Sequence, residues 1–219
     1  MDLFLQRVEP KLYMLLLGCK PKGRFTEQHD VFFGIGHSLR ELVPHIYNFW
    51  PEAKGNLHID AWREISRVDG YTVRVISKKK LAKSDFGFST KQGDQINATC
   101  EISDQGAQNQ LQLFFLNLGG YKIGEFEEFH YKFLSVAENP TAAIKSAKAA
   151  SFYKHTGFKG AGSHVDEKYG VDVDDILAIQ DILNPLFKDQ YALEILPGKG
   201  PEDELHLGYL QLWRIKETS

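Results

Sequence analysis

The sequence predicts an α+β protein made of two tandem ββαββ-like repeats, each with an antiparallel sheet covered by a helix, packed as a pseudo-two-fold pair. Three observations support this. The chain matches itself when it is shifted along its own length. Each half carries the same succession of strand, strand, helix, strand and strand patterns. Aromatic residues make up 12% of the 219 residues, which favours sheet structure because their rings pack well on a pleated surface.

The internal match has a shift of 101 positions and runs without a gap from Leu12 to Gly34. Repeats are sought first because a missed repeat changes the whole fold assignment. The identical pairs are Leu12 and Leu113, Leu15 and Leu116, Leu17 and Leu118, Gly18 and Gly119, Gly23 and Gly124, Phe25 and Phe126, Glu27 and Glu128, His29 and His130, and Phe32 and Phe133.

Two shorter matches follow in the same order along the chain. His58-Ile59-Asp60 corresponds to His164-Val165-Asp166, and Tyr71–Ile76 corresponds more weakly to Tyr191–Leu196. Three matches in one order indicate a duplication. We therefore expect a first repeat at 1–82, a polar linker or irregular meander at 83–110, and a second repeat at 111–219.

The first half reads as strands around one helix. Apolar or β-branched runs predict strands, Asp69-Gly70 predicts a turn, and Leu39–Phe49 has the apolar spacing of a helix that begins after Ser38, with Glu41 in a capping box. Pro44 would kink or shorten that helix. The expected strands are Leu12–Leu17, His29–His37, Leu57–Ile65 and Tyr71–Ser77.

The second half repeats this order. Asn139 is expected to cap a helix that has Pro140 at its first position and alanines along one side, which lets it lie close to a sheet. Val173–Leu183 is ambiguous between a strand and a short helix. The expected strands are Leu111–Leu118, Glu128–Ala137, Tyr191–Leu196 and Leu205–Ile215.

Composition favours a cytoplasmic protein with reduced thiols. The net charge of −3 gives no reason to expect a nucleic-acid or membrane-surface partner. Met1–Lys11 mixes charged residues and Pro10 into its apolar residues and so does not resemble a signal peptide. Cys19 and Cys100 show no CxxC spacing, so each is expected to act as a small apolar residue.

Four segments of the chain resemble a small, uncharacterised bacterial family known only as a domain of unknown function, which occurs in one or two copies per chain. The segments are KLYMLLLGCKPKGRFTEQHDVFFGIG, GNLHIDAWREI, FYKHTGFKGAGSHVDEKYGVDVDDI and EDELHLGYL. The resemblance implies a duplicated bacterial domain. It implies no activity, cofactor or catalytic residue.

The repeated polar pairs are the candidate functional residues. On a strand, residues two apart share a face, so an imidazole and a carboxylate would stand side by side in each pair. If the pairs neighbour each other, each half offers two imidazoles and two carboxylates. The candidate cluster is Glu27, His29, His58 and Asp60 in the first half, with Glu128, His130, His164 and Asp166 in the second.

Three interpretations of these pairs remain open. The simplest is structural, with each histidine in a hydrogen-bonded pair that fixes a turn to a sheet. A metal site for Zn²⁺, Mn²⁺ or Fe²⁺ would use the four histidines as ligands, and a general acid–base cluster would use the same residues. No organic cofactor is expected, because the chain lacks the fingerprints of nucleotide binding.

Other motifs give weaker indications of function. The loop from His155 to His164 follows a helix C-terminus, where a phosphate site is not favoured. The acidic stretch from Asp166 to Asp175 and the lysines from Lys78 to Lys83 are expected to be solvated. Nucleophile motifs such as G-x-S-x-G are absent from the sequence.

The function expected first is that of a non-enzymatic binding or interaction protein with an unidentified protein or small-ligand partner. The alternatives are a metal-dependent or acid–base enzyme that uses the repeated pairs, and a structural protein that assembles with copies of itself through its sheet edges.

Overall fold

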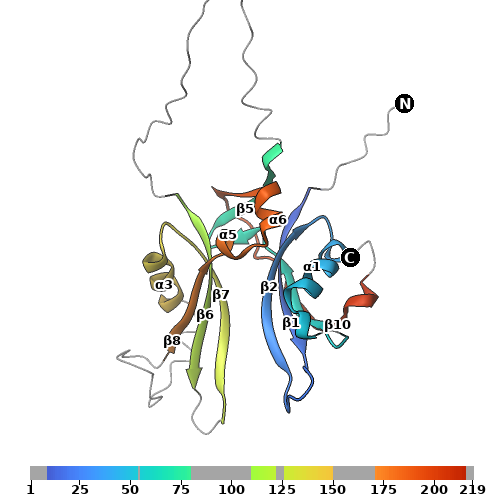
Figure 1. The fold of residues 1–219 in the computed structure, drawn as a ribbon. Helices are drawn as coiled ribbons and strands as arrows, with labels where there is room; N and C mark the ends of the chain where they lie inside the picture. The colour runs from blue at the N-terminus through green and yellow to red at the C-terminus, as the bar shows by residue number, and fades with distance from the viewer. Residues whose placement is uncertain (1–8, 54, 80–109, 122–125, 150–170, 216–219) are drawn as a thin grey trace, which may run out of the picture.

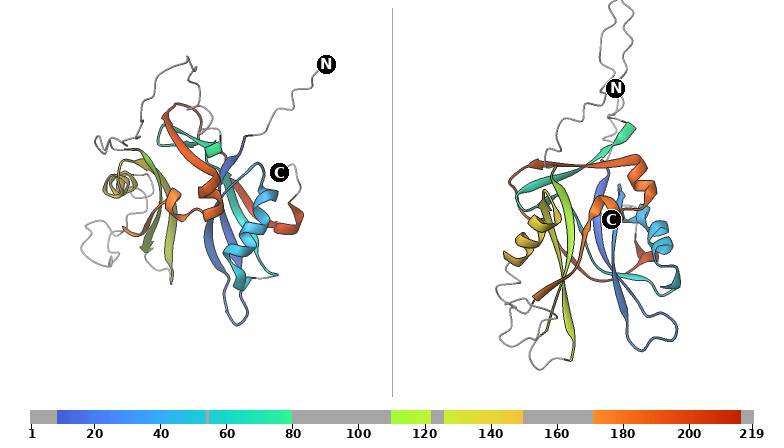
Figure 2. Two further views of the ribbon diagram at one scale, coloured as in Figure 1. Left: turned by 45° about the horizontal axis from the view of Figure 1, so that its top comes forward. Right: turned by 60° about the vertical axis from the view of Figure 1, so that its left-hand side comes forward.

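The chain is an α+β protein with antiparallel sheets and few helices. The computed structural model describes residues 9–53, 55–79, 110–121, 126–149 and 171–215 (Figure 1). Two larger sheets lie side by side with a helix on the outer side of each, and a smaller sheet lies at one end of both (Figures 1 and 2).

The first larger sheet has the strand order β10-β3-β1-β2, with antiparallel neighbours throughout. The helix α1, Leu39–Phe49, packs against β2. Three of its strands come from the first half of the chain, and the last strand of the chain completes the sheet. The strands are β1 (Lys11–Cys19), β2 (Gln28–Gly36), β3 (His58–Glu64) and β10 (His206–Gln211).

The second larger sheet has the order β7-β6-β8 and is also antiparallel. The helix α3, Pro140–Ala149, covers it with the buried alanines Ala143 and Ala147. These small side chains allow the close approach that the sequence predicts. The strands are β6 (Gln112–Tyr121), β7 (Glu128–Ala137) and β8 (Val171–Ala178).

The third sheet differs from the predicted arrangement. The fourth strand expected in each half does not join the sheet of its own half. Instead β5 (Tyr71–Ser77) and β9 (Tyr191–Pro197) pair with each other in the order β4-β5-β9, where β4 is Arg67–Val68. Short turns do favour pairing of consecutive strands, but here one strand from each half pairs with the other in a separate sheet. Local sequence does not encode such a pairing.

Shorter elements link the strands. The ambiguous segment 173–183 is resolved as the end of β8 followed by the short helix α5, Ile179–Ile182. The short helix α6, Pro185–Gln190, was not predicted from the sequence. Its N-cap is Asn184, whose side chain accepts a hydrogen bond from the Leu186 N–H at 2.9 Å. The predicted strand Leu205–Ile215 is shorter than expected, because a 3-10 turn occurs at Leu212–Arg214. Another 3-10 turn occurs at Pro51–Ala53.

The helix starts follow the capping signals to different degrees. The Asn139 side chain accepts a hydrogen bond from the Ala142 N–H at 2.9 Å, as expected for a cap. Ser38 occupies the N-cap of α1, but its side chain makes no capping hydrogen bond. Glu41 instead accepts from the backbone N–H of His37 at 2.8 Å. Pro44 lies inside α1 without ending it.

The strand registers of the two larger sheets coincide at the shift of 101 positions. Leu12 lies opposite Ile35, and Leu113 lies opposite Val136. Gly18 lies opposite His29, and Gly119 lies opposite His130. Residues that match in sequence therefore hold matching positions in β1 and β2 and in β6 and β7.

The main core extends from under α1 into the space between the two larger sheets. Phe33 of β2 and Phe115 of β6 meet edge to face across this core, with ring centroids 5.5 Å apart. A second cluster, which includes Phe114 and Leu116, packs under α3. Because side chains alternate along a strand, residues on the faces away from α1 and α3 point toward the space between the sheets.

The β4–β5 turn ties the first half to β7. Asp69 and Gly70 both have positive φ, 53° and 79°, as in the tight hairpin turns that Asp-Gly predicts. The Asp69 carboxylate accepts hydrogen bonds from the Ser135 hydroxyl at 2.9 Å and the Val136 N–H at 3.0 Å. Among the residues that the structure describes, no helix has the length and apolar character needed to span a bilayer.

Candidate metal centre

The first polar cluster lies around Gly18 on the inner face of the first sheet. Gly18 is the direct cross-strand partner of both His29 on β2 and His58 on β3. The central strand thus carries no side chain where the two flanking strands carry imidazoles. Both imidazoles can therefore lean over the glycine toward the same carboxylates.

A β-bulge adds Asp60 to this cluster. Leu17 pairs with Ile59 while Leu16 pairs with Ala61, so Asp60 is an extra residue without a partner on β1. Bulges bend a strand and redirect a side chain, and they are common next to functional sites. Here the bulge brings the Asp60 carboxylate to the histidines.

The four polar side chains contact one another closely. Nε2 of His58 lies 3.1 Å from Oε1 of Glu27 and 3.2 Å from Oδ1 of Asp60. Nε2 of His29 lies 3.2 Å from Oδ2 of Asp60 and 3.9 Å from Oε2 of Glu27. That Asp60 oxygen is buried and accepts no hydrogen bond from a described residue. The nitrogen and oxygen atoms therefore converge on one small volume.

His58 is the most deeply placed member. Its side chain is only 6% exposed, and its Nδ1 lies 3.2 Å from the backbone carbonyl oxygen of Asn56. Since a carbonyl oxygen only accepts, Nδ1 carries the proton. Nε2 therefore faces Glu27 and Asp60 and needs a proton or a metal ion between itself and the two carboxylates. The Tyr209 ring of β10 lies against the imidazole, with centroids 4.4 Å apart.

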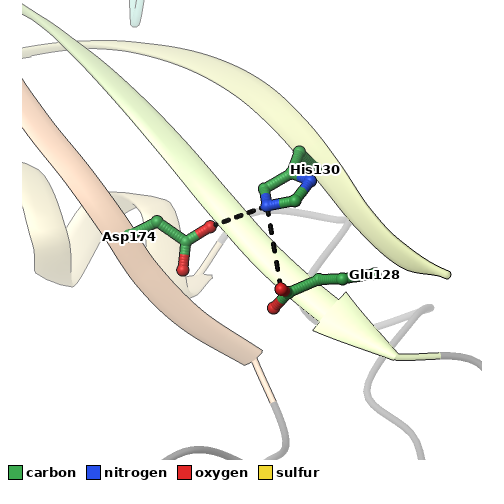
Figure 3. A group of neighbouring side chains, drawn as sticks. All are labelled: Glu128, His130 and Asp174. Atoms are coloured by element: carbon green, nitrogen blue, oxygen red, sulfur yellow. Dashed lines mark ion pairs between the residues drawn. The ribbon is translucent and has the colours of Figure 1, made fainter. Parts of the chain in front are cut away.

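The second cluster repeats the geometry around His29. Nε2 of His130 lies 3.2 Å from Oδ2 of Asp174 and 3.9 Å from Oε2 of Glu128 (Figure 3). These are the distances found for His29 in the first cluster. One ligand atom of each of the three residues lies within 4.8 Å of the others, so they could share a metal ion.

Asp174 was not among the candidate residues. It belongs to the acidic stretch that was expected to be solvated, yet it is the extra residue of a bulge, because Leu118 pairs with Val173 and Asn117 with Asp175. Its place in β8 is that of Asp60 in β3. The sequence signal for Asp174 was a run of alternating acidic residues and valines after the loop 155–164. This run aligns with Asp60 at a larger shift than the shift that matches His58 to His164.

His164 and Asp166, which the sequence analysis matched to His58 and Asp60, lie outside the described residues. In the backbone register, Asp172 is the partner of Gly119, the position that His58 has opposite Gly18. The structure thus brings Glu27, His29, His58 and Asp60 together, and it brings Glu128 and His130 together with Asp174.

The two repeated glycines make room for these clusters. A Cβ atom at Gly18 would collide with Nε2 of His58 and would lie 2.5 Å from Oδ2 of Asp60. At Gly119 it would lie 2.6 Å from Oδ2 of Asp174 and 2.8 Å from Oε1 of Glu128. Any larger residue would displace the polar groups, which gives a physical reason for glycine at both positions.

The spacing of donor atoms suits a shared divalent ion. Nitrogen and oxygen ligands lie about 2.0–2.2 Å from Zn²⁺, so two ligand atoms of one ion are roughly 3–3.5 Å apart. The distances of 3.1 and 3.2 Å around His58 fall in this range. They are also at the long end of an N–H···O hydrogen bond, so geometry alone is compatible with a proton as well.

Other sequence candidates lie elsewhere or outside the described residues. The loop 155–164 and Cys100 are not described. Lys78 and Lys79 are exposed, as expected for solvated side chains. Cys19 is buried with a free thiol, and burial, with a smaller contribution from the charge of Glu27, raises the pKa of this thiol. Cys19 is therefore held as an unreactive thiol beside the first cluster.

Comparisons with known proteins agree with an uncharacterised domain of this kind. A family model described as Domain of Unknown Function (DUF1543) matches residues 24–75, the part of the chain that holds all four members of the first cluster. No curated protein matches the chain. The function of this protein is thus unknown from its relatives.

A solved structure has a similar fold. It is the crystal structure of a protein Il1583 from Idiomarina loihiensis, with a TM-score of 0.54 and 21% sequence identity. The match covers 93% of this chain and 98% of that chain. The likeness is one of fold and carries no activity.

Proposed function

We propose that this chain is a metal-binding protein that holds one divalent transition-metal ion at each of its two histidine–carboxylate clusters. Imidazole and carboxylate ligands together suit Zn²⁺, Mn²⁺ and Fe²⁺. The first ion would be bound by Glu27, His29, His58 and Asp60. The second would be bound by Glu128, His130 and Asp174.

The observation that carries this proposal is the environment of His58. Its Nδ1 donates to the Asn56 carbonyl, and this is the outer-shell hydrogen bond that orients metal-binding histidines. Its Nε2 is 3.1 Å from one carboxylate oxygen and 3.2 Å from another. A cation placed there would satisfy the imidazole and both carboxylates at once, and burial would strengthen their interaction because the local dielectric constant is low.

We also propose that the two clusters descend from one site by duplication, with the halves related by an approximate two-fold axis through the β5–β9 pair. Support comes from that pairing. Tyr71 lies opposite Pro197, and Ser77 lies opposite Tyr191. With Tyr71 equivalent to Tyr191, the pairing is self-complementary, as a two-fold relation requires.

The proposed class is a binding protein rather than an enzyme of a stated reaction. This proposal agrees with the binding or interaction protein expected from the sequence, and it takes a metal ion as the ligand of the repeated pairs. A cytoplasmic location stays part of the proposal. Oligomeric state and protein partners stay predictions.

The test is metal content. Protein purified without a metal-affinity tag is analysed by inductively coupled plasma mass spectrometry, then stripped with a chelator and titrated with Zn²⁺, Mn²⁺ and Fe²⁺ by calorimetry. We expect two ions per chain, one per chain in His29→Ala or His130→Ala, and none in the double variant.

The matched control is His37→Ala. His37 also pairs with a carboxylate, since its Nδ1 lies 3.0 Å from Oε2 of Glu41, but this pair is outside both clusters. The control should bind as the unchanged protein does. A metal-free protein that binds none of the three ions tightly, and whose His29→Ala variant unfolds more easily, would show that the clusters are structural hydrogen-bond networks.

A further inference from the structure

A cleft lies between the two larger sheets, next to both clusters along the strands. It has a volume of about 380 Å³, at the lower end of the range for small-molecule pockets. Its apolar wall comes from Met14, Leu16 and Val31 of the first sheet and from Phe133 of β7. We call it the inter-sheet cleft.

Three cationic residues line this mainly apolar cleft, and one of them, Arg67, already donates to the Thr72 hydroxyl. Arg63 enters from β3 and Lys132 from β7. Both are partly buried, and burial lowers the pKa of Arg63, although the charges of Asp203, Tyr131 and Glu202 partly offset this effect. Removing a cation from water costs free energy unless a counter-ion or hydrogen bonds replace the lost hydration.

Among the described residues, neither Arg63 nor Lys132 has a counter-ion within 4 Å. Within the described part of the chain, Arg63 makes no hydrogen bond and no ion pair closer than 4 Å. Lys132 donates only to the backbone carbonyl of His130, at 3.3 Å. Arg63 alone carries five N–H donors in a planar fork that matches a carboxylate.

Two of the three carboxylates along the cleft are already occupied by other donors. Asp203 accepts from the Ser66 N–H at 2.8 Å, the Ser66 hydroxyl at 2.6 Å and the Arg67 N–H at 2.9 Å. Asp69 accepts from Ser135 and Val136 on β7. These two carboxylates fix the chain around the cleft, and the third, Glu202, is exposed, so Arg63 and Lys132 keep donors for a ligand.

We propose that the inter-sheet cleft binds a small amphipathic carboxylate. Arg63 and Lys132 hold its anionic head group, and its apolar body lies against Met14, Leu16, Val31 and Phe133. One negative charge fits better than two, because the nearby carboxylates of Glu202 and Asp203 would repel a second charge. This site is separate from the metal sites and does not depend on their occupancy.

The probe series is hexanoate, octanoate and decanoate, with octanol and octyl phosphate as head-group controls. Binding is measured by calorimetry and by the shift of the melting temperature, on protein treated with a chelator so that bound metal plays no part. We expect at least one of the carboxylates to bind, at least about tenfold more tightly than octanol, since each charge-assisted hydrogen bond contributes this much or more.

The variants Arg63→Gln and Lys132→Gln should each weaken carboxylate binding by about tenfold or more while leaving octanol unchanged. The matched controls are Arg74→Gln on β5 and Lys145→Gln on α3, which remove exposed cations outside the cleft. They should bind as the unchanged protein does. Circular dichroism confirms that each variant is folded.

Three outcomes would overturn the proposal. They are octanol binding as tightly as octanoate, no binding by any member of the carboxylate series, and octyl phosphate binding more tightly than octanoate. All three outcomes are measured on the unchanged protein, so the proposal can be tested even if a cleft variant does not fold. Failure of metal binding would leave this experiment unaffected.

Discussion

Asp60 and Asp174 occupy the same position in their sheets, since each is the extra residue of a β-bulge beside a glycine-bearing central strand. Each carboxylate then lies 3.2 Å from Nε2 of the histidine on the opposite side of that strand, His29 or His130. Bulges at matching places indicate that the position of the aspartate, and not only its charge, is required there.

The first prediction compares two neighbouring aspartates in β8. Asp174→Asn should reduce bound metal from two ions per chain toward one, because it removes a charged ligand of the second cluster. The affinity of that site should fall by about 100-fold or more, since even outer-shell changes cost 10–100-fold. Metal analysis and calorimetric titration measure both quantities.

Asp175→Asn is the matched control. Asp175 is adjacent and acidic, but its Oδ2 lies 3.4 Å from the Asn117 side-chain nitrogen, away from the cluster. It should keep both ions. Equal losses in the two variants would mean that only the general acidity of β8 matters.

The second prediction concerns the glycine beneath the first cluster. Gly18→Ala should abolish metal binding at that cluster, because the new methyl group would displace His58 and Asp60. Overpacking of this kind should also lower the free energy of unfolding by about 1–3 kcal/mol. Metal titration and urea denaturation report the two effects separately.

Gly34→Ala separates stability from metal binding. A Cβ atom there would lie 2.7 Å from the Phe32 ring and 2.9 Å from Leu42, in the core under α1. It should destabilise the fold to a similar extent and keep both metal ions. If Gly34→Ala also lost the metal, the effect of Gly18→Ala would reflect general destabilisation.

The third prediction concerns the link between the two halves. Asp69→Ala should lower the free energy of unfolding by about 1–3 kcal/mol, because it leaves the Ser135 hydroxyl and the Val136 N–H without their acceptor. Asp69→Asn should cost less, since asparagine tolerates positive φ and keeps one acceptor oxygen. Chemical denaturation measures both, and equal stability of Asp69→Ala and the unchanged protein would contradict the role given to this contact.

The fourth prediction is a loss of stability at high pH. Burial, together with the nearby charges of Glu64 and Glu41, raises the pKa of Tyr13 to about 12 from its ordinary value of 10. Because the folded state holds this proton more tightly than the unfolded state, the contribution is present below pH 10 and is lost as the pH rises from 10 to 12. The loss amounts to about 2–3 kcal/mol at full ionisation.

Tyr13→Phe tests this directly. It keeps the aromatic packing against Trp62, whose ring centroid lies 6.2 Å away, and removes the ionisable hydroxyl. Its free energy of unfolding should fall less steeply than that of the unchanged protein between pH 10 and 12. Parallel curves would rule out Tyr13 as the source.

Local patterns in the sequence predicted most of the elements because each depends on neighbouring residues. The apolar spacing from Leu39 to Phe49 predicted α1 with its observed bounds, and the run from Glu128 to Ala137 predicted β7 in the same way. The turn at Asp69-Gly70 and the cap at Asn139 were confirmed as well. The short helix α6 was missed, since it has too few turns to show a periodic pattern.

The candidate site was predicted in part. Sequence spacing placed Glu27 beside His29, because alternate residues of a strand share a face. The same rule paired His58 with Asp60, although a β-bulge directs Asp60 in the structure. That both pairs meet at Gly18 depends on pairing of β1 with two strands from different parts of the chain. Asp174 was missed because a bulge decides its direction, and a bulge is a property of two paired strands.

The sequence by itself determined the α+β class, the antiparallel strands and the repeated glycine, histidine and glutamate positions, since these depend on local propensity and on self-similarity. Only the tertiary structure decided that β5 and β9 pair across the halves, that β10 joins β3, and that Arg63 and Lys132 face one cleft. Contacts between residues far apart in the chain depend on how whole sheets bury their apolar faces, and a local pattern does not encode that choice.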